Sequence, residues 1–305
     1  MGLVKKYLLM DILITGSNGF LGSKIVEKLR IIDNITSLSR SSGDYKISLE
    51  KQIPIFRKKF NLVIHVAGKA HIIPKTHIEK QLFHDINVTG TRNLLNGLEK
   101  LNPPKSFVFI SSVSVYGQEF GENINEDFPL QANDSYGISK IEAEKIVQEW
   151  CRKQNVICTI LRLPLLVGEN PSGNLGAMLR AIDKGYYFNV CGGKARKSMV
   201  LANDVAAFIP KVAKIGGVYN LTDGYHPNFH ELSTVICKNR NKKKPLNMPL
   251  IIANLLAFIG DVIGKNMPLN TVKLKKITSN LTFDDSKARK IAGWNPNSVL
   301  NDLNI

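Results

Sequence analysis

Three glycines near the start of the chain, Gly16, Gly19 and Gly22, constrain its fold more than any other feature. They lie between a short apolar run at 11–14, typical of a strand, and the segment 20–29, whose apolar residues recur at helical spacing. A glycine turn in this context lets a pyrophosphate approach the backbone N–H groups of the helix N-terminus. The pattern predicts a dinucleotide site, although glycine-rich turns also occur for structural reasons alone. Its expected members are Gly16, Asn18, Gly19, Phe20, Leu21 and Gly22.

Strand-like and helix-like segments alternate from about residue 8 to residue 167, which predicts an α/β fold with a Rossmann-type, doubly wound parallel sheet. After Gly168 the pattern becomes irregular, where we expect a smaller C-terminal lobe that binds substrate. The expected domains are therefore a dinucleotide-binding domain at 8–167 and a substrate-binding lobe at 168–305, of which about 197–232 folds back on the first domain. Strands are expected at 11–15, 36–39, 62–66, 106–111 and 158–163.

A second group of candidate residues begins at Tyr136, which with Lys140 opens a predicted helix that continues to Trp150. Residues four apart share a helix face, so the Lys140 ammonium should lower the Tyr136 pKa from its usual value near ~10, as a proton donor to a ketone requires. The buried run 107–117 predicts a strand that brings Ser111 and Ser112 to its carboxyl end, where parallel sheets bind ligands. A lone Tyr-x-x-x-Lys pair is more often an exposed helix pair, but here it follows the loop and the serines in order.

Together these motifs resemble the extended short-chain dehydrogenase/reductase family, in its nucleotide-sugar epimerase, dehydratase and ketoreductase branch. The likeness extends over nearly the whole chain. The resemblance implies that Ser112, Tyr136 and Lys140 are catalytic and that Asn87 helps to seat the active-site helix, although Asn87 could merely cap its own helix. Beyond the loop, the serines and the Tyr136/Lys140 pair, it includes 63–68, 87–91, 161–164, 174–175, 204–205, 219–221, 285–287 and 293–296.

The end of the second predicted strand bears on the choice of cofactor. A carboxylate there normally accepts the adenosine ribose hydroxyls of NAD, whereas Arg40 stands at this point, beside Ser39 and Ser41. This favours NADP(H) and leaves NAD(H) open, since Arg40 could instead stack on the adenine and Asp44 lies close in sequence. The resemblance adds further expected cofactor contacts at Val66, Ala67, Gly68, Ser111 and Pro164, with Tyr136 and Lys140.

Contacts to the substrate follow from the resemblance alone. Asn174 and Leu175 would contact the diphosphate of a nucleotide sugar, and Ser112 and Ser114 are expected to meet the sugar. The family usually places an Arg in the loop before Asp204 to clamp the phosphates. Here Arg196 and Lys197 occupy that loop, and a Lys cannot form the bidentate contact of an Arg. The aromatic residues at 186–188 are candidates for base stacking or for the core.

The residues after Ser112 narrow the reaction type. Dehydratases of this branch carry an Asp-Glu pair directly after the catalytic residue, whereas Val113 and Ser114 follow here, so dehydration is not expected. The segments 161–165 and 279–287 look more like reductases of UDP-4-keto-6-deoxy-HexNAc sugars for bacterial surface polysaccharide. We therefore expect reduction at C4 of a UDP-linked sugar, with an NAD-dependent 4-epimerase as the alternative. A non-catalytic dinucleotide sensor would not need the Ser, Tyr and Lys together.

Composition limits the partners. The net charge is +16, but the densest basic run, 238–244, lacks interleaved aromatic residues, so nucleic-acid binding is not expected. The apolar segment 249–264 is shorter than the ~20 residues of a spanning helix and predicts a buried or interfacial helix, which leaves weak peripheral membrane contact open. Residues 1–9 lack the apolar core of a signal peptide. Cysteines 151, 158, 191 and 237 show neither metal spacing nor a disulfide framework, so we expect no metal site and a cytoplasmic protein.

Two predicted helices, 83–101 and 138–150, carry more apolar residues than covering a sheet requires. Family members often pair these two helices across a two-fold axis, so a homodimer is expected. Internal packing of the same side chains is the alternative.

Overall fold

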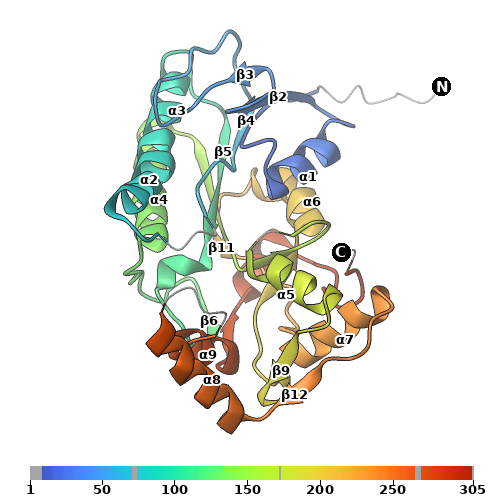
Figure 1. Cartoon of the computed structure of the whole chain (residues 1–305). Helices are drawn as coiled ribbons and strands as arrows, with labels where there is room; N and C mark the ends of the chain where they lie inside the picture. Colours follow the sequence, from blue (N-terminus) through green and yellow to red (C-terminus); the bar gives the residue numbers. More distant parts are fainter. Residues whose placement is uncertain (1–8, 71–73, 172, 265–268, 304–305) are drawn as a thin grey trace, which may run out of the picture. The chain divides into compact units, whose positions relative to one another are not determined.

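A seven-stranded sheet in the order β11-β7-β5-β4-β1-β2-β3 is the centre of this computed structural model, which describes residues 9–70, 74–171, 173–264 and 269–303 (Figure 1). β1 pairs in parallel with β2 and β4, β4 with β5, and β2 with β3. The expected α/β class with a parallel sheet is confirmed. Its strands are β1 (Asp11–Thr15), β2 (Asn34–Ser39), β3 (Tyr45–Lys46), β4 (Leu62–His65), β5 (Ser106–Ser112), β7 (Ile157–Leu163) and β11 (Gly217–Asn220).

Helices cover both faces of this sheet, which explains why its inner strands are continuous apolar runs rather than alternating ones (Figure 1). α1 (Phe20–Leu29) packs against α6 (Ala202–Val212), while α4 (Ser135–Gln154) contacts both α2 (His77–His84) and α3 (Gly90–Glu99). The core between α3, α4 and the sheet contains Leu94, Leu98, Phe107, Phe109, Val147 and Trp150.

The segment around Asn87 forms a π-helical turn, Asp85–Thr89, between α2 and α3. The five strands expected from the sequence agree closely with β1, β2, β4, β5 and β7. The short strands outside the central sheet were not expected, because three apolar residues in a row carry no readable period.

Two compact units make up the described residues. Unit 1 contains the described parts of Met1–Val115, with Ala132–Arg162 and Ala202–Tyr219. Unit 2 contains the described parts of Tyr116–Gln131, Leu163–Leu201 and Asn220–Ile305. The chain therefore crosses between the units several times, and α6 belongs to unit 1 although it follows the first long segment of unit 2.

Unit 2 is built from short strands and helices around its own apolar core. That core includes Val167, Leu179, Met199, Leu232, Ile236 and Val299. The strands pair as β10-β8, β12-β9 and β13-β6. They are β6 (Gly121–Ile124), β8 (Leu165–Val167), β9 (Phe188–Val190), β10 (Met199–Leu201), β12 (Leu246–Met248) and β13 (Leu281–Phe283). The helices are α5 (Gly173–Asp183), α7 (Phe229–Asn239), α8 (Leu250–Ile263) and α9 (Thr271–Thr278), and shorter turns are Val113–Tyr116, Cys191–Gly193 and Ala288–Ala292.

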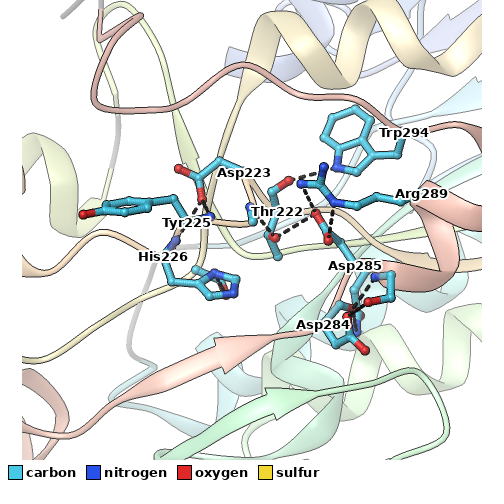
Figure 2. Close-up of polar contacts among 12 residues, drawn as sticks. Thr222, Asp223, Tyr225, His226, Asp284, Asp285, Arg289 and Trp294 are labelled. Carbon is cyan, nitrogen blue, oxygen red and sulfur yellow. Dashed lines mark hydrogen bonds and ion pairs between the residues drawn. The ribbon is translucent and has the colours of Figure 1, made fainter.

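A buried polar network ties the C-terminal segment to the turn after β11. Figure 2 shows the Asp285 carboxylate between Thr222, which donates from Oγ1 at 3.0 Å, and Arg289, which donates from Nε at 2.8 Å. The Trp294 indole donates to the Thr222 carbonyl oxygen at 2.9 Å. These residues of the 285–287 and 293–296 motifs therefore hold unit 2 together.

The apolar side chains that suggested a dimer are mostly packed within unit 1. Phe83, Leu94 and Leu98 are fully buried, and Val147 lies in the same core as the two leucines. Of the apolar residues in the two segments, Ile138 is 41% exposed, and Ile86, Ile141 and Ile146 are half-buried. The stripes thus have internal partners, and a homodimer is not required to cover them.

The apolar segment predicted as a buried or interfacial helix forms α8, which is exposed rather than buried. Within the described residues, none of the helices combines the length and the apolar character that crossing a bilayer requires. The interpretation of residues 1–9 falls almost wholly outside the described residues.

Candidate active site

The glycine loop packs directly against the end of β4. Gly16 has a φ of +67°, and a Cβ there would lie 2.7 Å from the Ala67 nitrogen. A Cβ at Gly22 would lie 2.1 Å from the Gly16 oxygen, so a side chain at either position would push the loop away. Gly19 caps α1 without a side-chain hydrogen bond. No described side chain caps the first N–H groups of the helix, so they are free to bind an anion such as a pyrophosphate.

A buried polar atom in this loop has no partner in the described structure. The Ser17 hydroxyl is 5% exposed and makes no hydrogen bond among the described residues. Ser17 and Asn18 line a cavity of about 650 Å³ together with Ser37, Ser42 and Gly43 from the end of β2 and the turn after it. An orphaned hydroxyl beside a glycine cradle fits a bound dinucleotide, because a buried polar group left unpaired costs free energy.

At the end of β2, Asp44 is held by hydrogen bonds, whereas Arg40 is exposed. The Asp44 carboxylate accepts hydrogen bonds from Ser37 N and Ser37 Oγ, both at 2.7 Å, and these bonds lower its pKa. It is thus committed to its own strand connection. Asn18 Nδ2 donates to Ser39 Oγ at 2.9 Å, which joins the glycine loop to this strand end. Arg40 is exposed next to that contact.

Lys140 is buried beside the ends of β4 and β5. Its Nζ donates to the Ile110 carbonyl oxygen at 2.8 Å and lies 4.7 Å from the centroid of the Phe109 ring. A Cβ at Gly68 would be only 3.3 Å from this Nζ. Burial lowers the Lys140 pKa to about 8, and the nearby Glu144 carboxylate partly opposes the shift.

Tyr136 and Ser112 come together in unit 1 as expected. The Ser112 side chain lies close enough to the Tyr136 phenol to act on its pKa, and Ser112 Oγ donates to Ser114 Oγ at 3.0 Å. Burial raises the Tyr136 pKa, the Ser112 side chain lowers it, and the Asp134 charge raises it. The expectation of a lowered Tyr136 pKa is therefore wrong in this structure, because burial of the phenol dominates and the Lys140 ammonium is directed to a backbone carbonyl. The phenol is accordingly protonated at neutral pH.

Asn87 connects three parts of the site. Its Oδ1 accepts from Lys69 N at 2.7 Å, and its Nδ2 donates to the Lys69 carbonyl at 3.1 Å and to Ser139 Oγ at 2.9 Å. It thus holds the segment after β4 against α4, one residue before Lys140. His65 is a packed residue, bonded to Thr15 Oγ1 and Thr91 Oγ1, and burial lowers its pKa to about 3.

Glu144 is a site residue that sequence reasoning missed. It accepts a hydrogen bond from the Ser111 hydroxyl and forms a buried ion pair with Arg162 at 2.8 Å. The Ser111 side chain is therefore engaged inside unit 1. Glu144 lies four residues after Lys140, a spacing that places both on one helix face and could have identified it.

The expected substrate residues Asn174, Leu175, Arg196 and Lys197 all lie in unit 2, as does Pro164. Asn174 is exposed on α5, whereas the Leu175 side chain is 2% exposed and packs in the unit 2 core, so only its backbone could meet a ligand. Arg196 Nη1 donates to the His226 carbonyl at 3.0 Å. Of the aromatic residues at 186–188, Tyr186 and Phe188 are exposed, and Tyr187 packs against that core.

Lys197 is a partly buried lysine in unit 2. Burial lowers its pKa to about 8, and repulsion from Lys276 adds to the shift. Lys276 pairs with Glu119 at 3.2 Å. Two ammonium groups close enough to repel each other favour the binding of an anion. Among the described residues, no three potential metal-binding His, Cys, Asp or Glu side chains lie together.

Comparison with known proteins decides the family. The family model described as NAD dependent epimerase/dehydratase family matches residues 12–221. A curated relative, N-acetyl-alpha-D-glucosaminyl-diphospho-ditrans,octacis-undecaprenol 4-epimerase of Escherichia coli O157:H7, is 30% identical over 91% of this chain and 88% of its own. The chain belongs to the NAD dependent epimerase/dehydratase family. It is thus an enzyme of the extended short-chain dehydrogenase/reductase type with a nicotinamide dinucleotide cofactor.

Another relative and two solved structures similar to this chain are also named epimerases. UDP-glucose 4-epimerase of Vibrio cholerae is 26% identical over 96% of this chain and 92% of its own. Among solved structures, UDP-glucose 4-epimerase of Thermotoga maritima has a TM-score of 0.72 at 21% identity, with 96% of each chain covered. UDP-glucuronic acid 4-epimerase of Bacillus cereus has a TM-score of 0.73 at 16% identity, again with 96% of each chain covered. These structures share the fold of this chain.

The burial of Lys140 generates a stability prediction. The folded pKa is about 8 and the ordinary value is 10.5, so between these values the unfolded chain binds more protons and stability rises with pH. The difference in the free energy of unfolding between the wild type and Lys140→Met should therefore shift in favour of the wild type by up to about 3 kcal/mol between pH 8 and pH 10.5. Urea unfolding at several pH values measures this, with exposed Lys145→Met as the matched control. Parallel curves for the wild type and Lys140→Met would contradict the burial of a charged Lys140.

Proposed function

We propose that this enzyme is a 4-epimerase that acts on a sugar linked through a diphosphate, with a UDP-hexosamine as the substrate. The observation that carries the proposal is the approach of the Ser112 side chain to Tyr136, one helix turn from the buried Lys140. Epimerisation rather than net reduction is supported by the relatives, since those of Escherichia coli and Vibrio cholerae are both named 4-epimerases.

Each side chain has one task in this reaction. Tyr136 must first lose its own proton to solvent; the phenolate then takes the proton from the sugar C4 hydroxyl as the hydride leaves C4, and the phenol formed returns that proton to the C4 oxygen after the ring has turned. Ser112 would hydrogen-bond the same oxygen. Lys140, one helix turn away, would hold the nicotinamide ribose, because its ammonium is directed to the Ile110 carbonyl oxygen rather than to the phenol. The nicotinamide ring supplies the hydride acceptor and donor. Asn87 is a positioning residue, because it holds α4 against the segment after β4.

The cofactor rests on the glycine loop and the end of β2. Gly16, Gly19 and Gly22 would take the pyrophosphate, with Ser17 contributing its unpaired hydroxyl. Arg40 is exposed where the adenosine ribose would lie, while Asp44 is bound to Ser37. This arrangement supports NADP(H) over NAD(H).

The diphosphate has a candidate clamp in unit 2. Burial lowers the pKa of Lys197, and the charge of Lys276, which pairs with Glu119, adds to the shift, so a diphosphate bound at Lys197 would stabilise its charged form. Unit 2 is accordingly the substrate-binding lobe, with Asn174 and the Leu175 backbone as further contacts. UDP is the carrier of the diphosphate that we propose. A polyprenyl carrier is the second candidate, and it is supported by the name of the Escherichia coli relative and by the exposed apolar face of α8.

The expected reductase of a UDP-4-keto-6-deoxy-HexNAc is the competing proposal. It rests on the 161–165 and 279–287 segments, and it uses the same Ser112, Tyr136 and Lys140. A reductase consumes one reduced cofactor per turnover, whereas an epimerase returns the hydride and needs no added reductant. A homodimer remains a proposal that light scattering would test.

The first prediction concerns turnover. The purified chain should interconvert UDP-GlcNAc and UDP-GalNAc without added reductant, and Tyr136→Phe should lower kcat by ~10²- to 10⁴-fold while dinucleotide affinity stays nearly unchanged. Tyr45→Phe, which removes a hydroxyl on β3 that accepts a hydrogen bond from Arg57 N at 3.0 Å, is the matched control. Turnover only with stoichiometric NADPH on a 4-keto sugar would replace the epimerase with the reductase. A Tyr136→Phe variant within a fewfold of wild type would remove Tyr136 from the chemistry.

The second prediction concerns cofactor choice. Arg40→Asp should weaken NADPH binding by about tenfold or more and leave NADH binding nearly unchanged, because a charge-assisted contact to the 2′-phosphate becomes a repulsion. Fluorescence titration of the apoprotein with each cofactor measures both affinities. Arg57→Asp, an exposed arginine in the same unit, controls for the charge change. If the wild type already binds NADH more tightly than NADPH, Arg40 does not read the phosphate.

A further inference from the structure

Helix α8 has its small residues inside and its large apolar residues outside. Ala253 is fully buried, Ala257 is 1% exposed, and a Cβ at Gly260 would lie 1.9 Å from the Leu269 oxygen. Every other residue of α8 is exposed. The largest exposures are those of Ile251 at 83%, Leu255 at 60%, Phe258 at 66%, Val262 at 73% and Ile263 at 66%. A surface helix normally turns such side chains toward the core, so this face has a partner outside the described structure.

The width of the apolar face around the helix indicates how broad a surface would cover it. At about 100° per residue, the outward apolar side chains span an arc of roughly 160°, with Ile251 and Phe258 within it. The two polar residues, Asn254 and Asp261, lie beside the buried strip and outside this arc. Asp261 also accepts hydrogen bonds from the Thr271 backbone and hydroxyl at the start of α9. A single protein helix covers only a narrow stripe, whereas a lipid surface covers the whole arc.

Exposed lysines in the segments next to α8 would attract an anionic surface. Lys242, Lys243 and Lys244 are exposed just before β12, which leads into α8, and Lys275 and Lys276 are exposed on α9, which packs against it. The chain as a whole carries 41 basic and 25 acidic residues. Basic side chains that border an apolar helix are attracted to anionic headgroups while the apolar face enters the acyl boundary.

From these observations we propose that α8 docks the protein on an anionic lipid bilayer. The helix lies in the plane of the interface, because its 14 residues are too few to cross the bilayer. Ile251, Leu255, Phe258 and Val262 enter the lipid, and the flanking lysines contact the headgroups. α9 connects this face to the Lys197 and Lys276 pair, so docking brings the proposed diphosphate clamp close to the membrane surface.

Vesicle flotation of the full chain tests the proposal. The wild type should float with vesicles of phosphatidylcholine and phosphatidylglycerol, and bind more weakly to phosphatidylcholine alone and at high salt. Ile251→Ser with Phe258→Ser should reduce the bound fraction by about tenfold or more, since two large side chains leave the lipid. The matched control is Ile31→Ser with Ile55→Ser, which changes two equally exposed isoleucines in unit 1 and should float like the wild type.

Three results would overturn the proposal: no flotation of the wild type, equal flotation of both double variants, or a wild-type dimer that the α8 variant splits without any vesicle binding. The last result, read by sedimentation velocity, would assign the face to a second copy of this chain. Sugar epimerisation with soluble UDP-GlcNAc, measured on the same samples, separates the two proposals. An α8 variant that folds and turns over normally but does not float supports docking, and a floating wild type without turnover contradicts only the proposed function.

Discussion

The burial of one ammonium group organises the active-site side of unit 1. Lys140 can remain charged there because Ile110 offers a carbonyl oxygen at 2.8 Å, the Phe109 ring lies below it, and Glu144 supplies a nearby negative charge. Gly68 leaves space for its Nζ, and Asn87 holds the neighbouring turn of α4. β5, the segment after β4 and α4 all contribute groups that contact Lys140 or its neighbours. A buried ammonium in such a place is a candidate functional group.

Much of this arrangement was predictable from the sequence because it depends on local rules. The glycines of the loop are required because a Cβ at Gly22 would lie only 2.1 Å from the Gly16 oxygen, and such requirements leave a clear trace in residue type. The buried parallel strands are continuous apolar runs, and Tyr136 and Lys140 share a helix face by their spacing. Strand ends and helix faces then place Ser112 beside Tyr136 without further information.

Other features depend on long-range packing and were not predictable. The direction of the Tyr136 pKa shift follows from how many atoms surround the phenol, which residue spacing does not report. Arg162 reaches Glu144 across the sheet, and Lys276 approaches Lys197 from a segment far along the chain. The apolar composition of α8 was evident, but whether Ala253 or Phe258 faces the protein depends on how closely α9 approaches. Because the backbone packs tightly against α8, only its small residues fit on the buried side, and its large apolar residues face outward.

In the proposed epimerisation the hydride returns to the same C4 atom from which it was taken, while Tyr136 and Ser112 handle the proton of the C4 oxygen. The most direct measurement uses UDP-GlcNAc with deuterium at C4, incubated with the purified chain and no added reductant, and follows the label in the product by mass spectrometry and NMR. The account predicts UDP-GalNAc that keeps the deuterium at C4 in full. Loss of the deuterium from C4, or formation of product only when NADPH is added, would contradict it.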